Sequence, residues 1–284
     1  MEPDLLGRPR LAAACTLPRA GATRVCSVCK GPVSAGFQAC WSCSVVARRL
    51  QSCFSPAAPA RNSCGSDGGA LGAGGECGNS SAGSGAGPPV VPITLFRPGS
   101  PIHRALVGYK SGRSASEREA LAGDVADLVG SFLTRHGACI ARLAGGGWDY
   151  LDVVPSTRRY ATPHPLARAL GSTTILSARD AHLLRRASAP MDHLQPDPAG
   201  FVARRTRARV LLLDDVFTTG ARAFSAARAL QASGAEVVAI VPVGRMVHTD
   251  DSRTQRWWEA AYHPRSVAEW VLAPCCVECS RPAA

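Results

Sequence analysis

Apolar positions in the C-terminal part of the chain predict alternating strands and helices. Residues 210–213 are apolar on both faces, which is typical of a central strand in a parallel sheet. A helical pattern over 221–232 stops at Gly234, and a second apolar run follows over 237–241. Strand, helix and strand in this order predict a right-handed parallel crossover. The fold class is therefore α/β, with ligands expected beyond the carboxyl ends of the strands.

The residues before this unit predict further elements of the same body. They are an extended segment over 90–96, a strand over 150–154, a short helix over 166–170 and an extended run over 173–176. Ser116-Glu117-Arg118-Glu119 fits a capping box at the start of another helix. The stretch 179–198 shows little apolar periodicity, which predicts a long mobile loop of the kind that covers active sites.

Composition divides the chain into four parts. Residues 55–89 are almost all Gly, Ala, Ser, Pro and Asn, and so few large apolar groups cannot offset the entropy lost on ordering. We interpret this stretch as a flexible linker. It separates a disordered tail over 1–25 and a Cys-rich head over 26–54 from a body over 90–284.

Two CxxC pairs mark the head as a metal site. Cys26 and Cys29 form one pair and Cys40 and Cys43 the other, so four thiolates can surround a tetrahedral Zn²⁺. Structural zinc is favoured because so small a segment has too little core to fold unaided. Chance clustering and a redox pair are the alternatives, although no thioredoxin-like βαβ unit surrounds these cysteines. Three further cysteines, Cys275, Cys276 and Cys279, could form a second metal corner only if a fourth ligand came from elsewhere in the chain.

Charge and cysteine usage narrow the class of protein. The formal net charge is +11, carried mostly by arginine, and it suits a polyanion such as DNA or a small phosphorylated ligand. No apolar run is long enough for a spanning helix, so no membrane insertion is expected. The apolar run 11–15 is too short for an export signal, and twelve cysteines without one indicate reduced thiols and a cytoplasmic protein.

An acidic pair and a threonine-glycine turn carry the candidate chemistry. Asp214 and Asp215 end a buried strand, where carboxylates are costly unless a cation or hydrogen-bond donor faces them. A ribose diol and Mg²⁺ would serve. The following turn, residues 218–221, leads into a helix whose free N–H groups form a phosphate site. The alternative is that the acidic pair caps the helix and Gly220 only permits a tight turn.

The whole string 210–221 resembles the signature by which type I phosphoribosyltransferases bind 5-phosphoribosyl-1-pyrophosphate (PRPP). The resemblance implies that Asp214 and Asp215 hold the ribose hydroxyls and act in catalysis. The other PRPP-binding residues that it implies at this loop are Val216, Phe217, Thr218, Thr219, Gly220 and Ala221. It also implies a pyrophosphate loop, matched by Pro155-Ser156-Thr157-Arg158, and a flexible hood, matched by 179–198.

The four-cysteine head, the segment Gly108-Tyr109-Lys110-Ser111-Gly112 and the PRPP signature together resemble the ComF family, which is associated with competence and DNA uptake. The resemblance implies a type I phosphoribosyltransferase-like domain preceded by a zinc-binding head. Two features depart from the family: the insert 55–89, and Arg159-Tyr160-Ala161-Thr162-Pro163 where Arg-Gly-Phe-Asn-Gln is expected.

The implied activity is transfer of phosphoribosyl from Mg²⁺-bound PRPP to a nucleobase or other amine, with release of pyrophosphate. Lys110, Arg158, Arg185 and Arg186 are candidates for holding the pyrophosphate, with a solvated basic face as the alternative. A competing hypothesis is a non-catalytic PRPP- or nucleic-acid-binding accessory protein that places its head and basic face on single-stranded DNA. A second copy of the chain, in a homodimer, is a further candidate partner.

Overall fold

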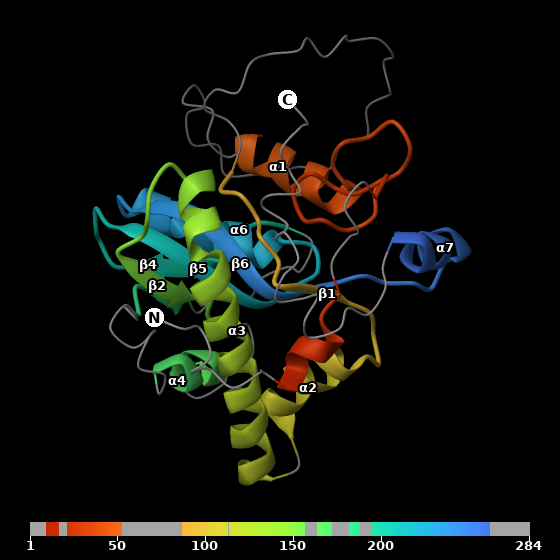
Figure 1. Ribbon diagram of the computed structural model, residues 1–284. Helices are drawn as coiled ribbons and strands as arrows, with labels where there is room; N and C mark the ends of the chain where they lie inside the picture. Colours follow the sequence, from red (N-terminus) through yellow and green to blue (C-terminus); the bar gives the residue numbers. More distant parts are fainter. Residues whose placement is uncertain are drawn as a thin grey trace, which may run out of the picture.

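A sheet of four parallel strands forms the centre of the body (Figure 1). Its order is β1 (Thr94–Phe96), β6 (Glu236–Met246), β5 (Arg209–Phe217) and β2 (Tyr150–Val153). Both longest strands, β5 and β6, are central and almost wholly buried, as their apolar sequences require. The prediction of a parallel α/β fold is confirmed at this level.

The computed structural model describes residues 10–16, 22–52, 87–112, 114–156, 164–171, 182–187 and 195–261. Its α-helices are α1 (Trp41–Ser52), α2 (Pro101–Ser111), α3 (Ala115–Leu143), α4 (Pro165–Gly171), α6 (Ala221–Ala232) and α7 (Ser252–Ala261). In this part of the chain, no helix is both long and apolar enough to cross a membrane. The predicted extended run 173–176 lies outside the described residues.

The predicted strand–helix–strand unit with parallel strands is confirmed. Strand β5 pairs in parallel with β6, and α6 connects them over the residues that the helical pattern indicated. Strand β5 is longer than its apolar run, because it continues through the acidic pair as far as Phe217. The carboxyl end of a central strand and the amino end of α6 therefore lie on the same edge of the sheet.

Side chains of β5 alternate between two cores, one on each face of the sheet. Leu211 and Leu213 pack with α2, α3 and α4, while Val210 and Leu212 pack with α6. Figure 1 shows α3 crossing one face and α6 lying behind the other. Each face is thus covered, which explains why β5 lacks a polar side.

The head belongs to the core on the α6 face. Within residues 22–52 an isolated bridge joins Val25 to Pro32 and helix α1 follows. Cys26, Cys29 and Val46 are buried in the same cluster as α6. Head and body therefore share apolar contacts.

Three segments differ from what the sequence patterns predict. The N-cap of α3 (Ala115–Leu143) lies two residues before the predicted one: Ser114 rather than Ser116 accepts a hydrogen bond from the Glu117 N–H, at 3.0 Å. Within the predicted tail, Arg10–Ala14 form a short 3₁₀ helix whose Ala12 is fully buried. Inside the predicted loop 179–198, β3 (Leu184–Arg186) pairs with β4 (Phe201–Ala203) in an antiparallel hairpin.

Candidate functional site

Asp214 and Asp215 lie near the carboxyl end of β5, and each residue is 2% exposed. Each carboxylate accepts a hydrogen bond from the next backbone N–H: Asp215 N donates to Asp214 Oδ1 at 3.0 Å, and Val216 N to Asp215 Oδ1 at 2.8 Å. Because water barely reaches them, these carboxylates need positive or hydrogen-bonding partners from the rest of the protein.

Two helices supply those partners. From α2, the Tyr109 hydroxyl donates to Asp215 Oδ2 at 2.8 Å, and the Lys110 ammonium pairs with the same oxygen. From α6, Arg222 Nη2 contacts Asp214 Oδ1 and lies 2.9 Å from Asp215 Oδ1. The acidic pair is thus matched by two cations, in a cluster that joins three elements of the body.

Burial dominates the titration of Asp214. It raises the pKa of Asp214 above its usual range, although the Arg222 guanidinium and the Lys110 ammonium act in the opposite direction. The side chains of Lys110 and Arg222 are 16% and 24% exposed, so both cations stand between the buried carboxylates and solvent. An anion approaching from solvent would meet these cations first.

The turn after β5 is closed by Gly220. This residue has φ +86°, and a Cβ atom there would lie 2.4 Å from the Phe217 ring, so no other residue fits without displacing that ring. Thr219 Oγ1 accepts a hydrogen bond from the Ala221 N–H at 3.3 Å, but no side chain caps α6 from its N-cap position. The amino end of α6 therefore offers N–H groups beside two threonine hydroxyls.

The structure places the predicted PRPP-binding residues as follows. Val216 and Phe217 end β5, Thr218, Thr219 and Gly220 form the turn, and Ala221 begins α6. Pro155 and Ser156 follow β2 on the same edge, where Val154 N donates to Leu213 O at 2.8 Å. Thr157 and Arg158 lie outside the described residues.

The remaining basic candidates separate from one another. Lys110 joins the acidic cluster, whereas Arg185 and Arg186 lie on β3. Arg186 Nη1 donates to Gly200 O at 2.7 Å and its guanidinium lies 5.5 Å from the Phe201 ring centre, so this side chain serves the β3–β4 hairpin.

Sequence reasoning missed Arg222 and the role of Tyr109. Arg222 stands two residues after Gly220, in the first turn of α6, and a tight turn at glycine brings that position back over the end of β5. Tyr109 is inside the segment 108–112, where only its lysine neighbour was assigned a role. In both cases the available signal was a polar side chain that a turn or a helix could bring next to the acidic pair.

His164 also belongs to this environment. Burial lowers its pKa to about 3, and the charges of Lys110 and Arg222 add to the effect. Its Nδ1 accepts a hydrogen bond from the Leu166 N–H at 3.2 Å, and its ring centre is 6.3 Å from that of Tyr109. His164 is therefore neutral in the folded protein at physiological pH.

We expect the free energy of unfolding to decrease as the pH is lowered, because His164 is neutral in the folded protein. The unfolded chain protonates this residue near its ordinary pKa of about 6.5, whereas the folded protein resists protonation. The stabilisation is complete above that pH and declines as the pH falls towards about 3; at about pH 5 the loss is about 2 kcal/mol. Replacement of His164 by Asn, which keeps an acceptor for Leu166, should flatten this decline in urea unfolding experiments. His248→Asn, at an exposed site, should not, and equal slopes for all three proteins would contradict the assignment.

The four cysteines of the head form a second candidate site. Their Sγ atoms all lie within 4.8 Å of one another, and those of Cys29 and Cys40 are 3.7 Å apart. Tetrahedral zinc with Zn–S bonds of about 2.3 Å requires S–S separations of about 3.8 Å. Cys26 Sγ accepts backbone N–H groups of Cys29, at 3.5 Å, and of Cys40, at 3.3 Å. The neighbouring thiols lower the pKa of Cys29 well below its usual value, which favours the thiolate that a metal ligand requires. The cluster could bind zinc.

A cavity of about 1080 Å³ lies between the head, the threonine turn and α7. Thr218, Thr219 and Cys40 line it, together with the indole rings of Trp41 and Trp257. Its basic lining residues are Arg24, Arg245, His248, Arg253 and Arg256, against one acidic residue, Asp251. The cavity therefore has a basic lining and is open to the turn that precedes α6.

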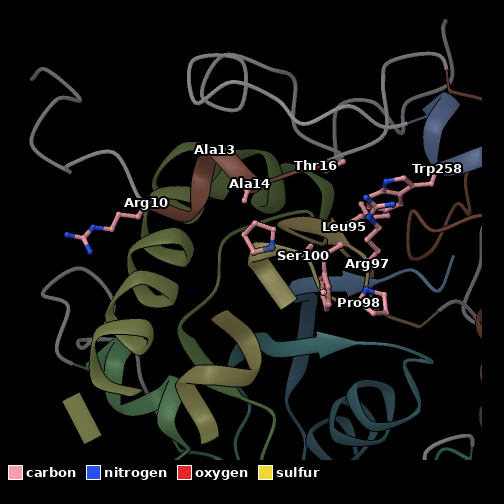
Figure 2. Close-up of a pocket in the computed structure, with 12 residues that line it drawn as sticks. Arg10, Ala13, Ala14, Thr16, Leu95, Arg97, Pro98, Ser100 and Trp258 are labelled. Carbon is pink, nitrogen blue, oxygen red and sulfur yellow. The ribbon is translucent and has the colours of Figure 1, made fainter. Parts of the chain in front are cut away.

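A second cavity, of about 620 Å³, is lined by Trp258 of α7 and contains none of the predicted site residues. Figure 2 shows its position between the 3₁₀ helix of residues 10–14, the end of β1 and the start of α2. Trp258 stands beside Arg97 and Pro98, while the Arg10 side chain points away from them. This cavity is separate from the acidic pair.

The fold and the two sites define an α/β protein with a parallel four-stranded sheet, a buried ion-pair cluster at the carboxyl end of its central strand, and a four-cysteine site. The sequence matches no protein-family model, and no curated protein is found to be similar to it.

Proposed function

We propose that the chain binds PRPP at the carboxyl end of β5 and transfers its phosphoribosyl group, as expected of a type I phosphoribosyltransferase of the ComF kind. One observation carries the proposal. The acidic pair and the threonine-glycine turn stand where the central parallel strand passes into α6, the location at which α/β proteins bind phosphorylated ligands.

The two ends of a ribose 5-phosphate have matching groups here. The N–H groups at the amino end of α6 and the hydroxyls of Thr218 and Thr219 suit the phosphate. Asp214 and Asp215 suit the ribose diol, provided that Lys110 turns from Asp215 towards the ligand. Lys110 can do so because its side chain reaches solvent, and its charge would then face the pyrophosphate.

Magnesium would enter with the ligand. The oxygens of the acidic pair already receive Lys110, Tyr109 and Arg222, so Mg²⁺ fits best as the counter-ion of the incoming pyrophosphate. In the proposed reaction, an acceptor nitrogen forms a bond to the anomeric carbon and loses its proton to the departing pyrophosphate or to water, while the bond from that carbon to pyrophosphate oxygen breaks with its electron pair going to that oxygen. Carboxylates near the ribose ring would stabilise the positive charge that develops on it. The acceptor is a nucleobase or another amine.

A nucleic-acid-binding role is the second candidate, and it is favoured by the surface of the head. The side chains of Phe37 and Trp41 are each 68% exposed, and Trp41 lines the basic cavity. Exposed aromatic rings beside arginines suit stacking with the bases of single-stranded DNA and neutralisation of its phosphates.

Calorimetry with PRPP and Mg²⁺ tests the proposal. We expect binding by the purified chain, and binding weakened roughly tenfold or more by Thr218→Val, since loss of one hydrogen bond to a charged group costs about 1.5–3 kcal/mol. Thr134→Val, at an exposed position of α3, is the matched control and should leave affinity unchanged.

The same protein should be titrated with a fluorescent single-stranded oligonucleotide. Binding of PRPP that Thr218→Val weakens would support the proposal. Absence of any PRPP binding, with oligonucleotide binding that Trp41→Ala weakens, would refute it in favour of the nucleic-acid role.

A further inference from the structure

Arg245 is a buried cation between the head and the body. It lies near the carboxyl end of β6, opposite Phe217 of β5, and is only 7% exposed. A guanidinium is costly to bury unless negative charge and hydrogen-bond acceptors surround it. Among the described residues, these groups come from the four-cysteine cluster and from the turn after β5.

The four-cysteine cluster supplies the negative charge. A Cβ atom on Gly31, two residues after Cys29, would lie 3.2 Å from Arg245 Nη2, so the guanidinium packs directly against the head. The Cys29 Sγ atom lies 3.4 Å from the same Cβ position, so the guanidinium and a cysteine of the cluster face the same point on Gly31. Four thiolates outweigh the charge of one Zn²⁺, so the metal-bound cluster would also need a neighbouring cation.

The turn after β5 supplies the acceptor. Arg245 Nη1 donates to the Phe217 carbonyl oxygen at 3.4 Å, and to that of Met246. The guanidinium carbon lies 5.8 Å from the centre of the Phe217 ring, the same ring against which Gly220 closes. Arg245 thus packs beside Gly31 and Cys29 of the head on one side and contacts the first residue of the 217–220 turn on the other.

We propose that Arg245 is a positioning residue that couples metal binding at the four cysteines to the conformation of the 217–220 turn. With the metal bound, the negatively charged cluster holds the guanidinium in place, and the guanidinium holds the Phe217 carbonyl and ring. Without the metal, the head loosens, Arg245 loses its anionic neighbour and the turn loses its support. The effect on PRPP affinity rests on the proposed function, whereas the coupling itself does not.

Hydrogen–deuterium exchange of the full chain tests the coupling. In the wild type, stripping zinc with a chelator should accelerate exchange of the 217–221 amides by about tenfold or more relative to strand residues 210–213. In Arg245→Gln these amides should exchange rapidly in the zinc-loaded protein, and stripping should add little. Arg253→Gln, an exposed arginine of the same cavity, is the matched control and should behave as the wild type.

A conservative variant separates charge from geometry. Arg245→Lys keeps the cation beside the cysteines but lacks the planar guanidinium group that reaches Phe217. In a chelator competition it should therefore retain more zinc than Arg245→Gln. The amides of its 217–221 turn should nevertheless exchange rapidly. This variant also decides the matter if Arg245→Gln does not fold. Equal responses to zinc removal in wild type and Arg245→Lys would overturn the proposal, as would no response in the wild type.

Calorimetry of the same proteins distinguishes the two proposals. If the exchange experiment shows coupling and the wild type binds no PRPP, the proposed function fails and the coupling stands. If the wild type binds PRPP and zinc removal changes neither affinity nor exchange, the coupling fails and the proposed function stands.

Discussion

Replacement of Arg222 by Met is expected to lower the free energy of unfolding by about 3–5 kcal/mol, because it leaves two buried carboxylates with one cation fewer. Methionine keeps much of the side-chain volume, so the loss would be electrostatic rather than a packing defect. Urea unfolding at neutral pH measures it. Arg256→Met, at an exposed position of α7, is the control and should cost much less.

A double-mutant cycle attributes the loss to the acidic pair. Asp214→Asn removes one of the charges that Arg222 neutralises, so the double variant should be more stable than the sum of the single losses predicts. Strictly additive losses would show that Arg222 stabilises the protein through something other than these carboxylates. Changing both carboxylates at once would remove the acidic partners of Lys110 and Arg222.

Loss of the metal is expected to destabilise the body as well as the head. The double change Cys29→Ser and Cys43→Ser should abolish zinc binding and lower the free energy of unfolding by several kcal/mol, because both residues are buried in the core that also contains α6. Elemental analysis and thermal unfolding of the purified chain measure the two effects. Cys139→Ser, at a buried thiol of α3 outside the cluster, should retain the metal. A melting temperature equal to that of the wild type, in protein without metal, would contradict the shared core.

The central part of the fold could be predicted because its local sequence patterns agree with the strands and the helix that form there. An apolar run, a helical pattern and Gly234 sufficed to predict β5, α6 and β6. Helix α2 was not predicted, although Ser100 and Pro101 are a typical N-cap and first helical residue. The segment 108–112 overlaps only the end of this helix and does not indicate where the helix begins.

The candidate site could be predicted only in part, since its partners are distant in the sequence. The acidic pair was singled out as costly to bury, and the four cysteines by their spacing. The cations that neutralise the pair come from α2 and α6, and local pattern does not indicate which arginine or lysine will meet a given carboxylate. The contact of Arg245 with the head likewise depends on how two parts of the chain pack together.

Because residues 10–16 also pack on the body, the segment that carries the head is attached to the body at both of its ends. Leu95 N donates to Thr16 O at 2.7 Å on β1, and Ile240 N donates to Pro89 O at 2.8 Å on β6, so the chain leaves and rejoins the sheet at adjacent strands. Because the entropy of closing such a loop changes by only about 0.6 kcal/mol when its length doubles, the number of residues between head and body can vary at little cost. A head that detaches also stays tethered at two points, so its return is an intramolecular step at high effective concentration.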